Sequence, residues 1–184
     1  EPNLVLGRAN KFFLGSCEKI FCYTDKIKNF PTKFKNKIVI IYPLVRDEFY
    51  KIKKSKTNND KFCLLIVGGS QGASIFDKNL KNSILNISKK FSIKIIQQTH
   101  SKNIFSLKEF YTSNNIENEI FNYDENFIEK ITKADVCITR AGASTLAELS
   151  ILNTPFIAVP LPNSKDNHQF ENANFYLKND CCWI

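Results

Sequence analysis

The stretch LLIVGGSQGAS, residues 64–74, joins a short apolar run to a glycine-rich turn and then to a helix-like pattern. Consecutive apolar residues without alternation are typical of a strand buried on both faces of a sheet. The glycines let the backbone turn tightly, and the free N–H groups at the start of the next helix favour an anion. The segment predicts a strand–turn–helix unit whose turn is either a structural connection or a phosphate seat that includes Ser70.

The same rhythm of short apolar runs and helix-like segments continues from Lys61 onward. Strands are expected at 63–67, 93–97, 119–123, 136–139, 156–159 and 182–184, and helices at 73–87, 106–111, 126–132, 144–152 and 167–177. This alternation predicts an α/β domain, doubly wound around a parallel sheet. Its ligands are expected beyond the carboxyl ends of the strands.

The first 60 residues do not follow this rhythm. Residues 1–45 hold a helix-like stretch, Val5–Leu14, and two short apolar runs, Ile20–Tyr23 and Ile38–Tyr42. Residues 46–60 are polar and rich in Lys and Asn, which indicates an interdomain linker. We therefore expect the end of one domain at 1–45, a linker at 46–60 and a second domain at 61–184. The chain starts without methionine and stops inside an apolar run, so we expect a fragment with an incomplete second domain.

The composition, 43% hydrophobic and 24% charged, is that of an ordinary globular protein. The formal net charge is +8, but only three of the 26 basic residues are Arg. The densest basic patch, Lys51–Lys56, has no aromatic residues between its lysines, so no nucleic-acid partner is expected. A solvated linker and contact with an anionic membrane surface both remain open for this patch. No apolar run reaches the roughly 20 residues that a membrane-spanning helix needs.

The six cysteines show no metal-ligand spacing, and Cys63 and Cys137 lie inside apolar runs. Reduced, buried thiols are therefore expected. The two histidines, His100 and His168, offer little material for a metal site, and no metal is expected.

A second strand–turn–helix unit is TRAGASTLAE, residues 139–148. Ser144 and Glu148 lie four positions apart and share one helix face. A carboxylate one turn into such a helix can accept hydrogen bonds from ribose hydroxyls. Alternatively, Ser144 and Thr145 are helix caps and Glu148 is a solvated charge. Two such turns on one sheet favour ligand binding.

A third segment, PLPNSKDNHQFENA, leads from a strand through a polar loop into a helix at residues 160–173. Its first helical turns carry His168, Gln169 and Asn172. Amide groups both donate and accept hydrogen bonds and therefore suit sugar hydroxyls. A capped helix without a ligand is the alternative.

Taken in this order, the three segments resemble the signature segments of the MurG-type N-acetylglucosaminyltransferases of peptidoglycan synthesis, in glycosyltransferase family 28. The opening EPNLVLGRAN is similar to a further stretch of that family, and Pro43–Arg46 to its interdomain hinge. The resemblance implies the GT-B architecture of two facing Rossmann-like domains. This chain would hold the end of the N-terminal domain and the C-terminal, donor-binding domain.

The resemblance also implies an activity. Such enzymes transfer GlcNAc, with inversion, from UDP-GlcNAc to an undecaprenyl-linked MurNAc-pentapeptide. They need no cofactor and no obligatory metal, and they work in peripheral contact with the cytoplasmic face of the bacterial inner membrane. Two alternatives stay open. One is another GT-B UDP-sugar enzyme, such as a glycolipid glycosyltransferase or a UDP-GlcNAc 2-epimerase. The other is a non-enzymatic nucleotide-binding module.

Individual residues gain roles from the same resemblance. Ser70 would contact the donor diphosphate, and Glu148 would bind the ribose hydroxyls. Gln169 would read the sugar, and the backbone at Asp124 would meet uracil. The remaining expected donor contacts are Asn3, Arg46, Ala143, Ser144, Thr145, Leu146, Ala147, His168 and Asn172. No residue is a convincing general base, so no catalytic residue is assigned, and the fragment is expected to bind UDP-GlcNAc weakly and to transfer nothing.

Overall fold

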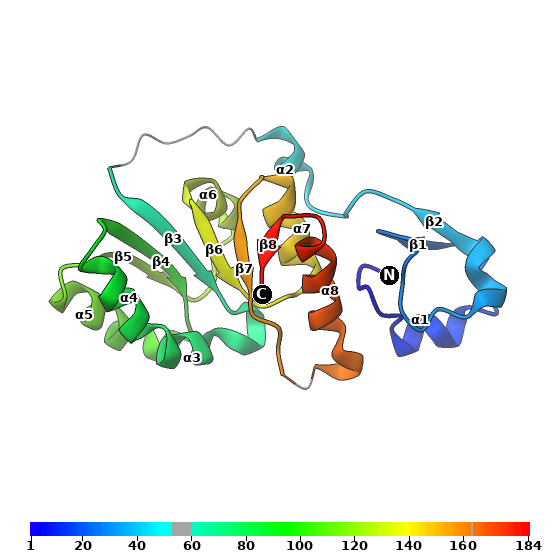
Figure 1. Ribbon diagram of the computed structural model, residues 1–184, viewed down its shortest axis with the longest axis horizontal. Helices are drawn as coiled ribbons and strands as arrows, with labels where there is room; N and C mark the ends of the chain where they lie inside the picture. Colours follow the sequence, from blue (N-terminus) through cyan, green and yellow to red (C-terminus); the bar gives the residue numbers. More distant parts are fainter. Residues whose placement is uncertain (53–59, 163) are drawn as a thin grey trace.

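The computed structural model describes residues 1–52, 60–162 and 164–184, and only the backbone of residues 70–73. Its main feature is a six-stranded sheet with strand order β5-β4-β3-β6-β7-β8 (Figure 1). All neighbouring strands run parallel. The strands are β3 (Phe62–Val67), β4 (Ile93–Gln98), β5 (Glu117–Phe121), β6 (Val136–Thr139), β7 (Phe156–Ala158) and β8 (Cys182–Trp183). The predicted α/β class with a parallel sheet is confirmed.

Helices connect these strands and cover both faces of the sheet. The α-helices are α3 (Gly69–Asn79), α4 (Lys81–Ser88), α5 (Ile104–Ser113), α6 (Phe127–Lys133), α7 (Ala143–Ile151) and α8 (His168–Leu177), and short 3-10 turns lie at Ser101–Asn103 and Lys165–Asn167. The single helix expected at 73–87 is in fact α3 followed by α4. The two helices meet at Leu80, and this break keeps both Phe76 and Ile84 in one apolar cluster.

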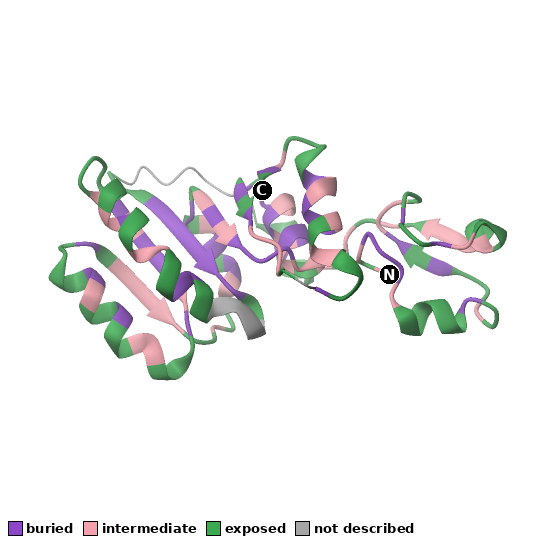
Figure 2. Ribbon diagram, turned by 60° about the horizontal axis from the view of Figure 1, so that its bottom comes forward, coloured by how far each residue is buried: buried purple, intermediate pink, exposed green. Residues whose placement is uncertain are grey.

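Strand β3 shows how the chain builds two apolar layers. Cys63, Leu65 and Val67 join the core cluster on the side of α6, α7 and α8. Leu64 and Ile66 join the cluster on the side of α3, α4 and α5. Since successive side chains of a strand point to opposite faces, a continuous apolar run fills both layers. Figure 2 shows β3 as an almost uninterrupted buried strand.

The order of the strands creates a topological switch point, where the direction in which the chain adds strands to the sheet reverses. From β3 the chain proceeds outward to β4 and β5, then returns to β6 on the other side of β3. The carboxyl ends of β3 and β6 lie in register, with Val67 opposite Thr139. Crevices at such switch points are where open α/β sheets bind ligands.

The N-terminal residues form a smaller unit beside α8 (Figure 1). It consists of α1 (Arg8–Phe13), the parallel pair β1 (Ile20–Cys22) and β2 (Ile38–Ile40), and the 3-10 turn Thr32–Lys37. The helix expected from Val5 begins only at Arg8, because Val5 is extended and pairs with Lys28. The unit has its own core cluster, Leu6, Leu14, Ile20, Cys22, Ile27 and Phe30.

The polar segment expected to be a linker starts with a helix, α2 (Asp47–Lys51). Its Phe49 is 1% exposed and belongs to the core cluster that includes Leu146 and Leu149 of α7. The buried Phe49 side chain therefore packs the start of the 46–60 segment against the core of the large sheet. Residues 53–59 lie outside the described residues, and the domain boundaries stay a prediction.

All six cysteines are free thiols, as expected. Cys22, Cys63, Cys137 and Cys182 are buried. Burial raises the pKa of Cys63 to about 11, so this thiol is protonated at neutral pH. In the described ranges, every helix falls short of the length and apolar character that a membrane span requires.

Candidate functional site: three loops at the carboxyl edge of the sheet

Three loops begin side by side where β3, β6 and β7 end. Because β6 lies between β3 and β7, the loops share one edge of the sheet. Backbone hydrogen bonds continue beyond the strands: Arg140 N–H donates to Val67 O (3.3 Å), and Val159 N–H donates to Thr139 O (2.7 Å). The structure thus brings together the three segments that the sequence singled out.

Two of these loops lead into helices without a side-chain cap. Neither α3 nor α7 has a side-chain hydrogen bond at its N-cap, which is Gly68 in α3 and Gly142 in α7. Ser144 and Thr145 are therefore not the caps of α7, and the first intrahelical bond runs from Leu146 N–H to Gly142 O (3.0 Å). Helix starts without a capping side chain leave N–H groups and the positive end of the helix dipole available to an anion, except that the first N–H of α3, that of Gly69, is taken by Gln98.

The turn after β3 depends on Gly69. Its φ of +65° lies in the left-handed region that L side chains rarely adopt. The side-chain oxygen of Gln98 accepts a hydrogen bond from Gly69 N–H (3.2 Å). Ser70 follows in the first turn of α3, but its side chain lies outside the described residues, so its expected diphosphate contact stays a prediction.

The start of α7 combines core and surface residues. Leu146 and Ala147 are fully buried, so their expected donor contacts stay a prediction. Ala143, Ser144 and Glu148 keep exposed area. Burial raises the pKa of the Glu148 carboxyl, and the charge of Arg46 partly opposes this shift. Within the described residues, no protein group donates a hydrogen bond to this carboxylate, which leaves it open to hydroxyl donors.

Arg46 lies close enough to Glu148 for its positive charge to act on that carboxyl. Its Nη1 forms an ion pair with Glu48 (2.9 Å) and donates to the backbone oxygen of Glu125 (3.2 Å). The guanidinium also stacks on Phe49, 5.4 Å from the ring centroid. Arg46 thus joins α2 to the loop that was expected to meet uracil.

Within that loop, the Asp124 carboxylate is occupied by protein contacts. It pairs with Lys130 (2.8 Å) and accepts a hydrogen bond from Asn126 N–H (2.7 Å). The hydrogen bond from Lys130 lowers the pKa of Asp124. The side chain therefore shapes the loop, which is compatible with a ligand contact through the Asp124 backbone.

The third loop is fixed by the start of α8. Gln169 Oε1 accepts a hydrogen bond from Leu161 N–H (2.9 Å), and Gln169 N–H donates to Ser164 Oγ (3.4 Å). His168 Nδ1 lies 2.8 Å from Lys165 O. Gln169 thus braces the loop with its oxygen, and its proposed sugar contact would fall to the amide nitrogen.

Asn172 is buried and connects the two units. Its Nδ2 donates to Asn3 Oδ1 (3.0 Å) and to Ala141 O (3.1 Å), and its Oδ1 accepts from Leu4 N–H (2.9 Å). Both protons of the amide nitrogen are used by protein groups. Its expected sugar contact stays a prediction, and the structure gives it a second role as a link.

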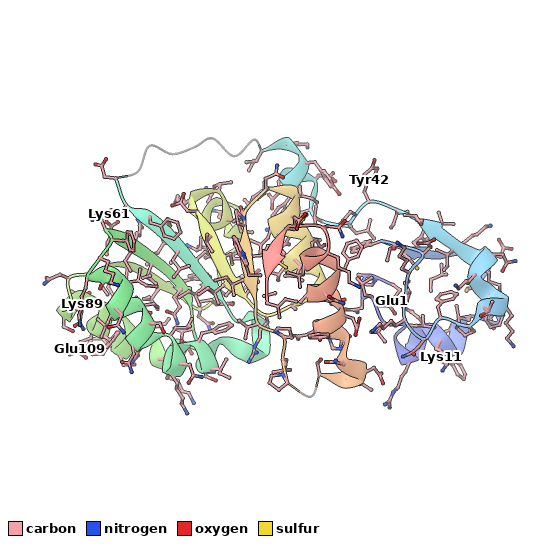
Figure 3. The ribbon with its side chains drawn as sticks, in the orientation of Figure 1. Glu1, Lys11, Tyr42, Lys61, Lys89 and Glu109 are labelled. Carbon is pink, nitrogen blue, oxygen red and sulfur yellow. The ribbon has the colours of Figure 1, made fainter. Side chains whose placement is uncertain are left out.

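A cavity of about 250 Å³ lies at the same junction. Its lining includes Asn3 and Arg8 from the N-terminal unit, and Lys165, Asp166 and His168 from the loop before α8. Figure 3 shows Glu1 at this junction. A larger cavity, about 460 Å³, lies at the amino ends of the strands, around Pro155 and Cys182 where β7 and β8 begin. It is remote from the three loops.

Gln98 and Arg140 were not among the predicted site residues. Gln98 accepts from Gly69 N–H and donates from Nε2 to Asn122 O (3.1 Å), so it joins two loops of the site. Arg140 was quoted only as part of its segment, although it is 8% exposed. In both cases the only signal was a polar residue at the end of an apolar strand. Across the described ranges, no three His, Cys, Asp or Glu side chains are grouped so that they could hold a metal ion.

The fold and the loops define a Rossmann-like domain with uncapped helix starts at its switch point. The family model of the glycosyltransferase family 28 C-terminal domain matches residues 63–184, and the chain belongs to this family. The chain is 54% identical over 184 residues to the UDP-N-acetylglucosamine--N-acetylmuramyl-(pentapeptide) pyrophosphoryl-undecaprenol N-acetylglucosamine transferase of Pelagibacter ubique, and covers 52% of that relative. It is 36% identical over 196 residues to the protein of the same name from Rickettsia felis, and covers 54% of it. All of this chain is matched in both cases, so the chain spans about half the length of these relatives.

Solved structures confirm the expected fold. Acinetobacter baumannii MurG superposes with a TM-score of 0.80 at 23% identity, covering 100% of this chain and 51% of that chain. A glycosyltransferase of kitacinnamycin has a TM-score of 0.59 at 14% identity, covering 90% and 41% of the two chains. At these identities the likeness concerns the fold.

Proposed function

We propose that the chain is the donor-binding part of an inverting N-acetylglucosaminyltransferase. The reaction transfers GlcNAc from UDP-GlcNAc to undecaprenyl-linked MurNAc-pentapeptide, lipid I to lipid II, in peptidoglycan synthesis. The observation that carries this proposal is the meeting of three donor-type loops at neighbouring strands, on both sides of the switch point. Family membership and the names of the relatives support it.

In this proposal the chain divides into two parts of a longer enzyme. Residues 1–45 belong to the end of the acceptor-side domain, residues 46–60 connect the domains, and residues 61–184 bind the donor. The core cluster of the N-terminal unit is separate from the two clusters of the large sheet, which supports this division.

Each side of the site has a distinct task. The starts of α3 and α7, with Ser70 and Ala143–Thr145, hold the diphosphate. Glu148 accepts hydrogen bonds from the ribose hydroxyls, and the loop at Asp124, held by Arg46, meets uracil. Gln169 contacts the sugar, and His168, Asn172 and Asn3 lie beside it.

The chemistry follows from these tasks. Inversion requires an acceptor hydroxyl in line with the anomeric carbon and a base that takes its proton. The departing diphosphate is stabilised by the N–H groups of two helix starts, a form of preorganised electrostatic stabilisation. We assign no residue of this chain as the base. The protein works at the cytoplasmic face of the bacterial inner membrane in peripheral contact with the lipid.

The first test is a titration of the ¹⁵N-labelled chain with UDP-GlcNAc, followed by NMR. We expect shifts at Gly69, at Ala143–Glu148 and at Gln169, a weaker response to UDP-glucose, and a loss of affinity in Glu148→Ala. A folded chain without shifts at millimolar UDP-GlcNAc contradicts donor binding by this part. The same titration with the complete reading frame separates a site that needs both domains from an incorrect assignment.

Two further assays separate the rival functions. A UDP-GlcNAc 2-epimerase would convert UDP-GlcNAc without any acceptor, whereas a transferase would release UDP only with its lipid acceptor. A non-enzymatic module would bind anionic liposomes in a salt-dependent way that UDP-GlcNAc does not change. Conversion without an acceptor contradicts the proposed transfer. Liposome binding contradicts it only when the chain also fails to bind UDP-GlcNAc, because the proposed transferase contacts the membrane itself.

A further inference from the structure

Arg140 occupies a central place among the three loops. It directly follows β6, and its side chain reaches the end of β7, where Nη1 donates to Val159 O (3.0 Å) and Pro160 O (3.1 Å). Its guanidinium also stacks on Phe76 of α3, 5.4 Å from the ring centroid. One side chain thus connects the end of β6 with the end of β7 and with the helix that follows β3.

Within the part of the chain that the structure describes, the charge of this side chain has no anionic partner. Arg140 is 8% exposed, and among the described residues no carboxylate forms an ion pair with it. Its Nε is buried and has no hydrogen-bond acceptor in the part of the chain that the structure describes. Burial lowers the pKa of the guanidinium, which remains charged at neutral pH. Buried charges in folded proteins are nearly always paired, so this one indicates a missing anion.

The site offers an anion a place close to Arg140. The residue lies three positions before Ala143, where α7 begins without a side-chain cap, and its guanidinium stacks on Phe76 in the C-terminal half of α3. We propose that Arg140 is a positioning residue for the donor diphosphate. Its hydrogen bonds to the two backbone carbonyls hold the loops in place. The diphosphate supplies the anionic partner that the guanidinium lacks among the described residues. This inference rests on the proposed function, because it requires a diphosphate ligand.

A purely structural role predicts a different result. If Arg140 only fixed the loops through Val159 O and Pro160 O, its loss would weaken every ligand of the site, including ligands without phosphate. If its charge acts on the diphosphate, the loss is specific to phosphate-bearing ligands. Comparing UDP with uridine therefore separates the two roles.

The experiment compares Arg140→Gln, Arg140→Lys and the wild type, each titrated with UDP, UDP-GlcNAc and uridine. We expect Arg140→Gln to lower the affinity for UDP and UDP-GlcNAc about tenfold, since a unit charge in a partly buried site contributes on this scale. Uridine affinity should change less than about twofold, and Arg140→Lys should restore most of the UDP affinity, since charge–charge attraction needs no particular donor geometry. Lys89→Gln is the matched control, because it removes one positive charge at the far end of the molecule (Figure 3). Equal losses for uridine and UDP, or UDP binding that is unchanged in Arg140→Gln, would overturn the proposal.

A second readout needs no variant. The chain has only three arginines, so the Nε–H groups of Arg8, Arg46 and Arg140 are few enough to assign by NMR. UDP should shift the Arg140 Nε–H signal, and uridine should leave it in place. A wild-type protein that binds UDP without moving this signal contradicts the inference while the proposed function stands. A wild-type protein that binds neither UDP nor UDP-GlcNAc contradicts the proposed function itself.

Discussion

Asn172, in the first turns of α8, donates a hydrogen bond of 3.0 Å from Nδ2 to Oδ1 of Asn3, which lies 169 residues earlier in the chain. The same side chain receives the N–H of Leu4 (2.9 Å). Its neighbour Glu171 forms an ion pair of 2.7 Å with Lys28. The start of α8 is therefore the place where the N-terminal unit is attached to the large sheet.

Replacing Asn172 with Ala should loosen this attachment. Leu4 N–H and Ala141 O would lose their buried partner, which costs about 2–3 kcal/mol of unfolding free energy. Urea unfolding measures the cost, and hydrogen exchange at the Leu4 amide shows whether the N-terminal segment is released. Asn86→Ala, at an exposed position of α4, is the control and should change neither quantity. Unchanged protection of the Leu4 amide in Asn172→Ala would show that the hydrogen bond does not hold the segment.

Replacing Glu148 with Gln should separate stability from binding. Burial raises the pKa of Glu148, so its ionised form costs stability once the pH rises through the folded-state pKa. The variant should therefore melt about 1–3 °C higher than the wild type at pH 7. At pH 4, where the wild-type carboxyl is protonated, the two melting temperatures should converge.

The same variant should bind the donor less well. Losing a carboxylate that accepts two ribose hydroxyls should lower UDP-GlcNAc affinity about tenfold, because hydrogen bonds to charged groups are the stronger ones. Calorimetric titration at pH 7 measures this loss. A variant that melts lower at pH 7, or that keeps full affinity, would argue against a desolvated carboxylate in the ribose site.

Replacing Gly69 with Ala tests the backbone of the turn after β3. Among the described residues, no atom lies within 4 Å of the position of an added Cβ, so the cost is expected to arise from the φ of +65°. We expect a loss of about 1–2 kcal/mol in unfolding free energy and a weaker response of the α3 start to UDP. Gly15→Ala, which also meets open space but lacks a positive φ, should be neutral or slightly stabilising. Equal stability of the two variants would refute a strained turn.

Replacing Glu117 with Gln should lower stability slightly above about pH 4.5 and leave it unchanged in strong acid. Glu117 pairs with Lys61 (2.8 Å) and Lys94 (2.9 Å), and these hydrogen bonds lower its pKa to about 2. A lowered pKa stabilises the folded state above the unfolded value near 4.5, and this contribution is lost as the pH falls towards 2. The partners are partly exposed and screened by solvent, so the difference between wild type and variant should stay below about 1 kcal/mol at pH 6.

Acid titration of both proteins, followed by circular dichroism, tests this expectation. The difference should shrink at high salt, because exposed ion pairs are screened. UDP binding should not change, because Glu117 is the first residue of β5 and the three loops follow the carboxyl ends of the strands. A larger effect at pH 2 than at pH 6 would contradict the assignment.

The parts of the site differ in how far they could be predicted. The glycine-rich turns were visible because a strand, small residues and a helix follow one another directly in the chain. The roles of Gln98 and Arg140 were not visible, because their partners, Asn122 and Val159, stand on separate loops. Helix α2 was missed because one buried side chain, Phe49, stabilises it against a strongly polar sequence background.

By itself, the sequence determined the local units: six strands, of which β5 begins two residues before the expected start at 119, most of the helices between them, and the three loops that follow β3, β6 and β7. Short-range preferences for extended, helical and turn conformations are encoded within a few neighbouring residues, so these units can be recognised in the chain. Only the tertiary structure decided the strand order β5-β4-β3-β6-β7-β8, the buried Arg140 Nε that has no acceptor among the described residues, and the link between Asn172 and Asn3. These features arise from contacts between residues far apart in the chain, whose burial and pairing exist only once the sheet has assembled.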